Sequence, residues 1–174
     1  MRAGAVEVAL TLEQQRFADE GIKTLIPVAG GKTLLELILE NLTSAGFRTF
    51  CIVIGPEHVA IRDFCSVMDL DVRFAVQDEP LGTAAAVLAA EGCFAKDALF
   101  LVVNSDNLYP VESLRRLRET NRPAMLAFER ETLIGRSNIP AERIAKFANV
   151  EIDARGMLRL IIEKPERAVP SWFV

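Results

Sequence analysis

At 174 residues the chain has the length of one domain with a substantial core, and 51% hydrophobic with 25% charged residues is typical of a globular protein. The formal charge of −4 argues against broad electrostatic binding to nucleic acid or to an anionic membrane, so anionic ligands need local cationic groups. No apolar run approaches the roughly 18 residues of a membrane span, and Glu7 and Glu13 interrupt any secretory apolar segment, which predicts a cytoplasmic protein.

The N-terminal part has the weakest pattern. Residues 5–10 (AVEVAL) are compatible with a short strand and residues 12–19 with a short helix. The following stretch, Gly21–Gly31, has a glycine at each end and Pro27 near its centre, which predicts a loop with an extended middle. Lys23 is the only charged residue in that loop.

Helices and strands alternate after this loop. The spacing of leucine and isoleucine predicts a helix over 33–45, ended by Gly46. A buried strand over 50–54, a helix over 57–67 and a strand over 72–76 follow.

The loop Gln77–Thr83, QDEPLGT, precedes an alanine-rich helix expected over 84–90. Pro80 and Gly82 predict a rigid turn, and Gly82 with Thr83 places free backbone N–H groups at the start of the helix, where an anion or the polar edge of a base can bind. The alternative is an ordinary loop in which Thr83 caps the helix.

The run Ala98–Val103 is wholly apolar and predicts a strand buried on both faces. It leads into Asn104–Asn107, where Asp106 is the only charge. Ligands of open α/β sheets bind outside the carboxyl ends of the strands, so Asp106 is placed to hold a divalent metal against phosphate oxygens. The alternatives are that Asp106 caps the next helix or that the polar cluster forms a plain turn.

The remaining elements follow in order. We expect a helix over 111–120 opened by Pro110, a strand over 124–129, a mobile loop over 129–142 and two antiparallel strands over 144–152 and 158–162. Glu163 and Lys164 then offer an acceptor for a hydroxyl and a donor for a phosphate, although charges at a strand end are also often only solvated.

The cysteines and the single histidine suggest no metal site. Cys51, Cys65 and Cys93 lie in expected apolar elements without CxxC spacing, which favours buried thiols over disulfides or zinc. His58 lies at an expected helix start, for which a plain surface role is favoured.

Four of these stretches resemble, in the same order, the nucleotidyltransferases that join an NTP to a sugar 1-phosphate and release pyrophosphate. They are KTLIPVAGGKTLLE at 23–36, QDEPLGTAAAV at 77–87, FLVVNSDNLY at 100–109 and IIEKP at 161–165. The resemblance implies a Rossmann-like mixed α/β sheet with helices on both faces, a three-layer αβα arrangement.

The resemblance also implies a role for each matching residue. Lys23 corresponds to a lysine that contacts phosphates, and Asp106 to the aspartate that binds catalytic Mg²⁺. Gln77 corresponds to the glutamine that reads uracil or thymine, and Gly82 to the glycine whose backbone lies beside the base. Both belong to a turn that includes Pro80 and Thr83.

The pair Glu163 and Lys164 corresponds to residues that hold the sugar hydroxyls and the sugar phosphate. Such chemistry joins two polyanions, so it requires positioning and charge neutralisation more than a proton-transferring base. The lack of a Ser-His-Asp arrangement therefore does not argue against an enzyme.

The chain departs from the family pattern at both ends. The family begins with a buried strand and a Gly-rich loop carrying an arginine, whereas this chain begins Met1-Arg2 without GxG. It stops about ten residues after the EKP motif, before a second metal-binding aspartate. We therefore expect an incomplete single domain over 1–174, with an irregular segment at 1–20, a nucleotide-binding core at 21–130 and the start of a sugar-phosphate-binding part at 131–174.

The expected substrates are UTP or dTTP and a sugar 1-phosphate, with Mg²⁺ as cofactor. No nucleic acid or membrane partner is expected, and a homo-oligomer is compatible with the sequence. An alternative is a catalytically silent binding or regulatory domain that lacks the Gly-rich loop. A cytidylyl- or molybdopterin-type transferase is a further alternative, which QDEPLGT disfavours because it resembles the uridylyl and thymidylyl branch.

Overall fold

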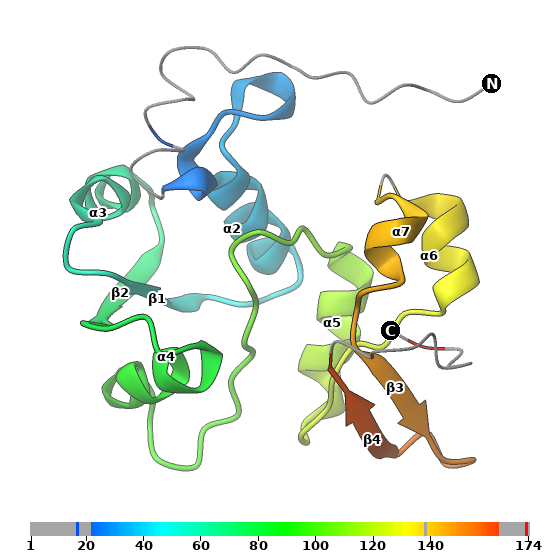
Figure 1. Ribbon diagram of the computed structural model, residues 1–174. Helices are drawn as coiled ribbons and strands as arrows, with labels where there is room; N and C mark the ends of the chain where they lie inside the picture. The colour runs from blue at the N-terminus through cyan, green and yellow to red at the C-terminus, as the bar shows by residue number, and fades with distance from the viewer. Residues whose placement is uncertain (1–16, 18–21, 138, 164–172, 174) are drawn as a thin grey trace. The chain divides into compact units, whose positions relative to one another are not determined.

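The structure, a computed structural model, describes residue 17 and residues 22–137, 139–163 and 173 (Figure 1). Its internal contacts divide the chain into two compact units, Met1–Pro123 and Ala124–Val174. The expected short strand at 5–10 lies outside the described residues, as does the expected helix at 12–19 apart from Phe17. The assignment of nucleotide and sugar phosphate to separate parts of the chain stays a prediction.

The first unit contains two helices of 3-10 type before α2, then two strands and further helices. In chain order these elements are η1 (Lys23–Leu25), η2 (Ala29–Gly31), α2 (Leu34–Ser44), β1 (Thr49–Ile54), α3 (Val59–Ser66), β2 (Asp71–Val76), α4 (Thr83–Ala89), η3 (Glu91–Cys93) and α5 (Val111–Thr120). The predicted helix–strand alternation from residue 33 to residue 76 is confirmed.

Strands β1 and β2 form a parallel pair, and α3 is the crossover between them. The register runs from Thr49 opposite Asp71 to Ile54 opposite Val76. In Figure 1, α2 and α3 lie above this pair and α4 lies below it. A parallel pair with a helical crossover is the unit from which α/β sheets are built, so the predicted α/β class is confirmed.

Helix α2 supplies the largest share of the core of the first unit. Thr33 caps it: the Thr33 hydroxyl accepts from the Glu36 backbone N–H at 3.1 Å, and the Glu36 carboxylate accepts from the Thr33 N–H at 3.4 Å. Such a cap stabilises a helix by about 1 kcal/mol. The buried apolar side chains from α2 and its neighbours are Leu35, Ile38, Leu39, Leu42, Phe50, Ile54, Ile61, Cys65 and Leu114.

The prediction that Ala98–Val103 forms a strand buried on both faces is wrong. The run lies outside the strands of the described structure, and Leu99, Phe100 and Val102 are 59%, 47% and 49% exposed. Leu101 and Val103 pack against the core instead. An apolar run becomes a strand only when a neighbouring backbone pairs with it, and no described residue pairs with this one.

The described residues of the second unit form two short helices and a hairpin: α6 (Arg130–Arg136), α7 (Ala141–Ile144), β3 (Asn149–Ile152) and β4 (Leu158–Ile162). The predicted antiparallel pair is confirmed, with Asn149 opposite Ile162, although Ile144 belongs to α7 and not to a strand. The turn is held by the Asp153 carboxylate, which accepts from the backbone N–H groups of Arg155 and Met157.

Two further predictions for the second unit are wrong. Residues 124–128 form no strand, and Glu129 makes only an isolated bridge to Phe173. The expected mobile loop at 129–142 instead contains α6 and the start of α7. Gly135 suggested a break, but it lies in the last turn of α6, where a glycine is tolerated.

The cysteines are free thiols, as predicted, but only Cys65 is buried, whereas Cys51 and Cys93 are half-buried. Among residues 22–137 and 139–163 no helix has both the length and the apolar character needed to cross a membrane.

Candidate functional site

The carboxyl ends of β1 and β2 carry the loop that the sequence singled out. The backbone N–H of Gln77 donates to the carbonyl of Ile54 at 2.9 Å, so Gln77 begins its loop directly beside the end of β1. After β1, the turn Gly55–His58 is closed by Gly55, whose N–H donates to His58 Nδ1 at 3.1 Å. His58 is the N-cap residue of α3 (Val59–Ser66), so the predicted helix start is confirmed, but its side chain is half-buried and hydrogen-bonded rather than a plain surface group.

Within the loop, Gln77 and Gly82 are brought together. The Gln77 side-chain amide donates to the carbonyl of Gly82 at 3.4 Å, a long contact for an N–H···O bond. Gly82 has φ +99°, a conformation that favours glycine, and no atom lies within 4 Å of the place where its Cβ would be. The loop thus leaves open space beside the Gly82 backbone and next to an amide.

The other two predicted site residues of this loop, Pro80 and Thr83, are exposed, and Thr83 is not the helix cap. Pro80 lies in the loop, and Thr83 is the first residue of α4. Gly82, not Thr83, is the N-cap residue, because its backbone already adopts the non-helical conformation there, so the alternative reading of Thr83 as the cap is wrong.

Asp106 lies in a turn, Asn104–Asn107, closed by the Asn107 N–H donating to the carbonyl of Asn104 at 3.4 Å. It does not cap α5, whose N-cap residue is Pro110. Its carboxylate is exposed, and within the described part of the chain it makes no ion pair and no side-chain hydrogen bond. Both carboxylate oxygens are therefore open to a ligand.

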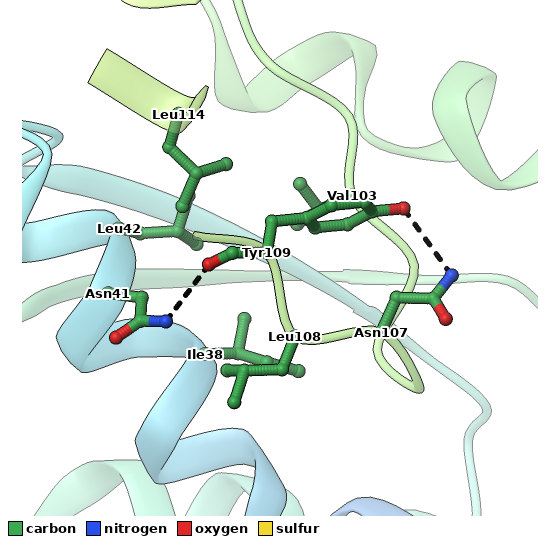
Figure 2. A pocket seen from close by; sticks show the side chains of 8 residues that line it. All are labelled: Ile38, Asn41, Leu42, Val103, Asn107, Leu108, Tyr109 and Leu114. Carbon is green, nitrogen blue, oxygen red and sulfur yellow. Dashed lines mark hydrogen bonds between the residues drawn. The ribbon is translucent and has the colours of Figure 1, made fainter. Parts of the chain in front are cut away.

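Two side-chain amides fasten the chain next to this turn (Figure 2). Asn41 Nδ2, on α2, donates to the backbone carbonyl of Tyr109 at 3.0 Å, and Asn107 Nδ2 donates to the Tyr109 hydroxyl at 3.4 Å. These three residues line a small pocket with apolar side chains from α2, α5 and the segment between them. Sequence reasoning missed Asn41, although an amide next to the apolar stripe of α2 is a signal.

Lys23 lies in η1 and is exposed. Its neighbour Leu25 is buried in the core, which fixes this 3-10 turn against α2. Among the described residues no hydrogen bond or ion pair links the side chains of Lys23, Gln77 and Asp106 with one another. No group of three or more metal-ligating side chains occurs in the described ranges either.

The remaining predicted site residues belong to the second unit. Glu163 follows β4 and is exposed. Lys164 lies outside the described residues, so its predicted contact with the sugar phosphate stays a prediction.

Comparison with known proteins gives a consistent result. A family model described as "Nucleotidyl transferase" matches residues 18–174. The "Bifunctional protein GlmU" of Rhodopseudomonas palustris (strain BisB5) is 38% identical over 112 residues, which cover 63% of this chain and 25% of that protein. The protein of the same name from Symbiobacterium thermophilum is 30% identical over 152 residues, 86% of this chain and 28% of the relative. The chain thus spans about a quarter of the length of these relatives.

Proposed function

Because the chain belongs to the nucleotidyl transferase family, we propose that it takes part in the transfer of a nucleoside monophosphate from an NTP to a sugar 1-phosphate. In this reaction a phosphate oxygen of the sugar 1-phosphate bonds to the α-phosphorus of the NTP. The bond from the α-phosphorus to the oxygen that bridges to the β-phosphorus breaks, and pyrophosphate leaves. The observation that carries the proposal is the open space beside Gly82, next to the Gln77 amide at the carboxyl end of β2.

We assign this loop to the uracil or thymine base of the nucleotide. A flat ring fits beside the Gly82 backbone, where a side chain would block it, and the Gln77 amide carries both a donor and an acceptor for the polar edge of the ring. The 3.4 Å contact between Gln77 and Gly82 is long, so its replacement by a contact to the base loses little. We assign UTP or dTTP on the resemblance of QDEPLGT to the uridylyl and thymidylyl branch.

Asp106 is the residue we assign to Mg²⁺. Its exposed carboxylate has no intramolecular partner within the described ranges, which fits a metal ligand. A single protein carboxylate suits Mg²⁺, which keeps several waters and binds substrate phosphates with the rest of its coordination sphere. When bound there, the ion would neutralise charge on the reacting phosphates.

The lysines and Glu163 complete the proposed assignment. The exposed ammonium of Lys23 is available to contact a phosphate of the nucleotide or of the sugar. Because the net charge of −4 does not attract anions, phosphate binding requires individual cationic groups such as this one. Glu163 would accept hydrogen bonds from sugar hydroxyls, and Lys164 would hold the sugar phosphate. None of these residues has to remove a proton, since the attacking phosphate is already an anion.

Binding measurements test this proposal. We expect UTP or dTTP with Mg²⁺ to raise the melting temperature, and CTP and GTP to leave it nearly unchanged. Gln77→Ala should weaken the preference for UTP or dTTP over CTP and GTP. Glu79→Ala, an exposed change in the same loop, should leave this preference unchanged. Equal loss of affinity for all four nucleotides in Gln77→Ala would contradict base reading.

The metal assignment has a separate test. Asp106→Asn should remove the Mg²⁺ dependence of nucleotide binding, while Asp97→Asn, another exposed carboxylate of the first unit, should preserve it. Release of pyrophosphate from UTP and glucose 1-phosphate distinguishes an enzyme from the silent binding domain, which binds nucleotide without turnover. A chain that binds no nucleotide would refute both the enzyme and the silent binding domain.

A further inference from the structure

We propose that Asn41 is a positioning residue for the Asp106 turn, acting through Tyr109. This inference rests on the proposed metal role of Asp106 and adds the residue that sets the place of its carboxylate. Asn41 and Tyr109 are 68 positions apart in the sequence, and the hydrogen bond at 3.0 Å joins α2 directly to the chain that leaves the turn.

The anchor side of this contact is rigid. Asn41 lies on α2, whose first turn is closed by the capping box of Thr33 and Glu36. The neighbouring side chains Ile38 and Leu42 are buried in the core. A side chain on such a helix has a fixed position, so its amide holds Tyr109 at a defined distance from the core.

Tyr109 connects Asn41 to the turn. Its carbonyl accepts from Asn41, its ring packs against the core, and its hydroxyl accepts from Asn107, the last residue of the turn (Figure 2). Asp106 is the residue directly before Asn107. A long amide contact of 3.4 Å thus links Tyr109 to the residue next to the proposed metal ligand.

The chain on the other side of the turn is held by apolar contacts and not by backbone pairing with a described residue. Residues 99–103 form no backbone hydrogen bond with any described residue, so the turn does not continue a paired strand. Leu101 and Val103 of this run pack against the core and Phe100 stacks on Phe94, and all three contacts are apolar. The Asn41 contact is therefore a directed polar link from α2 to the chain that carries Asp106. Removal of residues that orient a metal ligand typically lowers metal affinity 10- to 100-fold.

The experiment uses Asn41→Leu, which has nearly the same size but cannot donate, and Asn41→Ser, in which the polar group is too short to reach Tyr109. The matched control is Glu40→Ala, also on α2, which removes the ion pair of Glu40 with Lys32. Hydrogen exchange of peptides covering residues 104–109 reports the order of the turn. Calorimetric titration of UTP and dTTP binding against Mg²⁺ concentration reports the metal site.

We expect both Asn41 variants to exchange faster over 104–109 and to need about 10-fold more Mg²⁺ for half-maximal nucleotide binding, with unchanged binding in the absence of Mg²⁺. Glu40→Ala should change neither readout. A purely structural role would instead lower the melting temperature without moving the Mg²⁺ midpoint, and that result would overturn the inference.

The two proposals fail in different ways. Unchanged exchange over 104–109 in both Asn41 variants would overturn the inference whatever the function. An unchanged Mg²⁺ midpoint in them, with Asp106→Asn abolishing the Mg²⁺ dependence, would overturn it and leave the proposed function in place. Mg²⁺ dependence that survives Asp106→Asn, or that is absent from the unsubstituted chain with both nucleotides, would overturn the metal assignment and this inference with it.

Discussion

Gly82 has a backbone conformation that favours glycine, and it lies at the proposed base-binding loop. At φ +99° an alanine is strained, although its methyl group would meet no atom within 4 Å. We expect Gly82→Ala to lower the free energy of unfolding by about 1–2 kcal/mol and to weaken UTP or dTTP binding. Urea denaturation and calorimetry measure the two effects.

Gly92→Ala is the matched control for this prediction. Its Cβ also would meet no atom within 4 Å, and its φ is not positive, so stability and binding should stay close to those of the unsubstituted chain. Equal losses in the two variants would show that the Gly82 conformation is not the cause.

Cys51 is a second residue with a testable property. Burial raises the pKa of its thiol to about 12, and a side-chain hydrogen bond with Cys93 adds to the shift. At pH 8 only about one thiol in 10,000 is then a thiolate, the form that reacts with iodoacetamide. We expect mass spectrometry to show slow alkylation of Cys51 at pH 8.

The Cys93 side chain provides the corresponding variant. Cys93→Ala removes a partner that raises the pKa of Cys51, so alkylation of Cys51 should become faster at a given pH. The rate should also rise with pH up to about 12 in the unsubstituted chain. A rate that levels off near pH 9 would contradict the raised pKa.

At the scale of elements, local signals identified the structures that depend on local interactions. The Thr33 and Glu36 cap and the leucine spacing determine α2, and both are visible in the sequence. The run Ala98–Val103 looks equally clear, but its state depends on a pairing partner elsewhere in the chain. Helix α6 was missed because Gly135 and the polar residues around it resemble a loop.

The same distinction applies to the candidate site. The loop Gln77–Thr83 was predicted at the end of β2, since polar residues after an apolar strand mark a loop at a sheet edge. The turn at Asn104–Asn107 was predicted from its polar residues, but the strand expected before it is absent from the described structure. The contact of Asn41 with Tyr109 could not be predicted, because it depends on how α2 packs against a segment 68 residues later.

Hydrogen exchange tests the unpaired state of the apolar run. Residues 99–103 lack backbone hydrogen bonds to described residues, whereas β1 is paired along its length with β2. We expect amides of 99–103 to exchange about 100-fold faster than those in the middle of β1. Protection equal to that of β1 would show that another backbone pairs with the run.

At the scale of the whole molecule, the two units have separate buried groups. Leu114 is 2% exposed in the core of the first unit, and Ile144 is 0% exposed in the second. We expect Leu114→Ala to lower the free energy of unfolding of the first unit by about 2–5 kcal/mol, and Ile144→Ala to lower that of the second by a similar amount. Hydrogen exchange in denaturant measures this, because amides should exchange faster only in the unit that carries the substitution.

Leu88→Ala serves as the control for both cavities, because Leu88 is 70% exposed and its removal leaves no buried void. Faster exchange in both units after either buried substitution would mean that the units unfold together. That result would contradict independent stability.

The β3–β4 hairpin has a consequence for how the protein behaves in concentrated salt. Leu158, Leu160 and Ile161 are 48%, 46% and 43% exposed, and alternate side chains of a strand point to opposite faces. Sulfate is excluded from apolar surface and favours its removal from water. Ammonium sulfate fractionation should therefore bring this chain out of solution early, at a lower saturation than its net charge of −4 alone suggests.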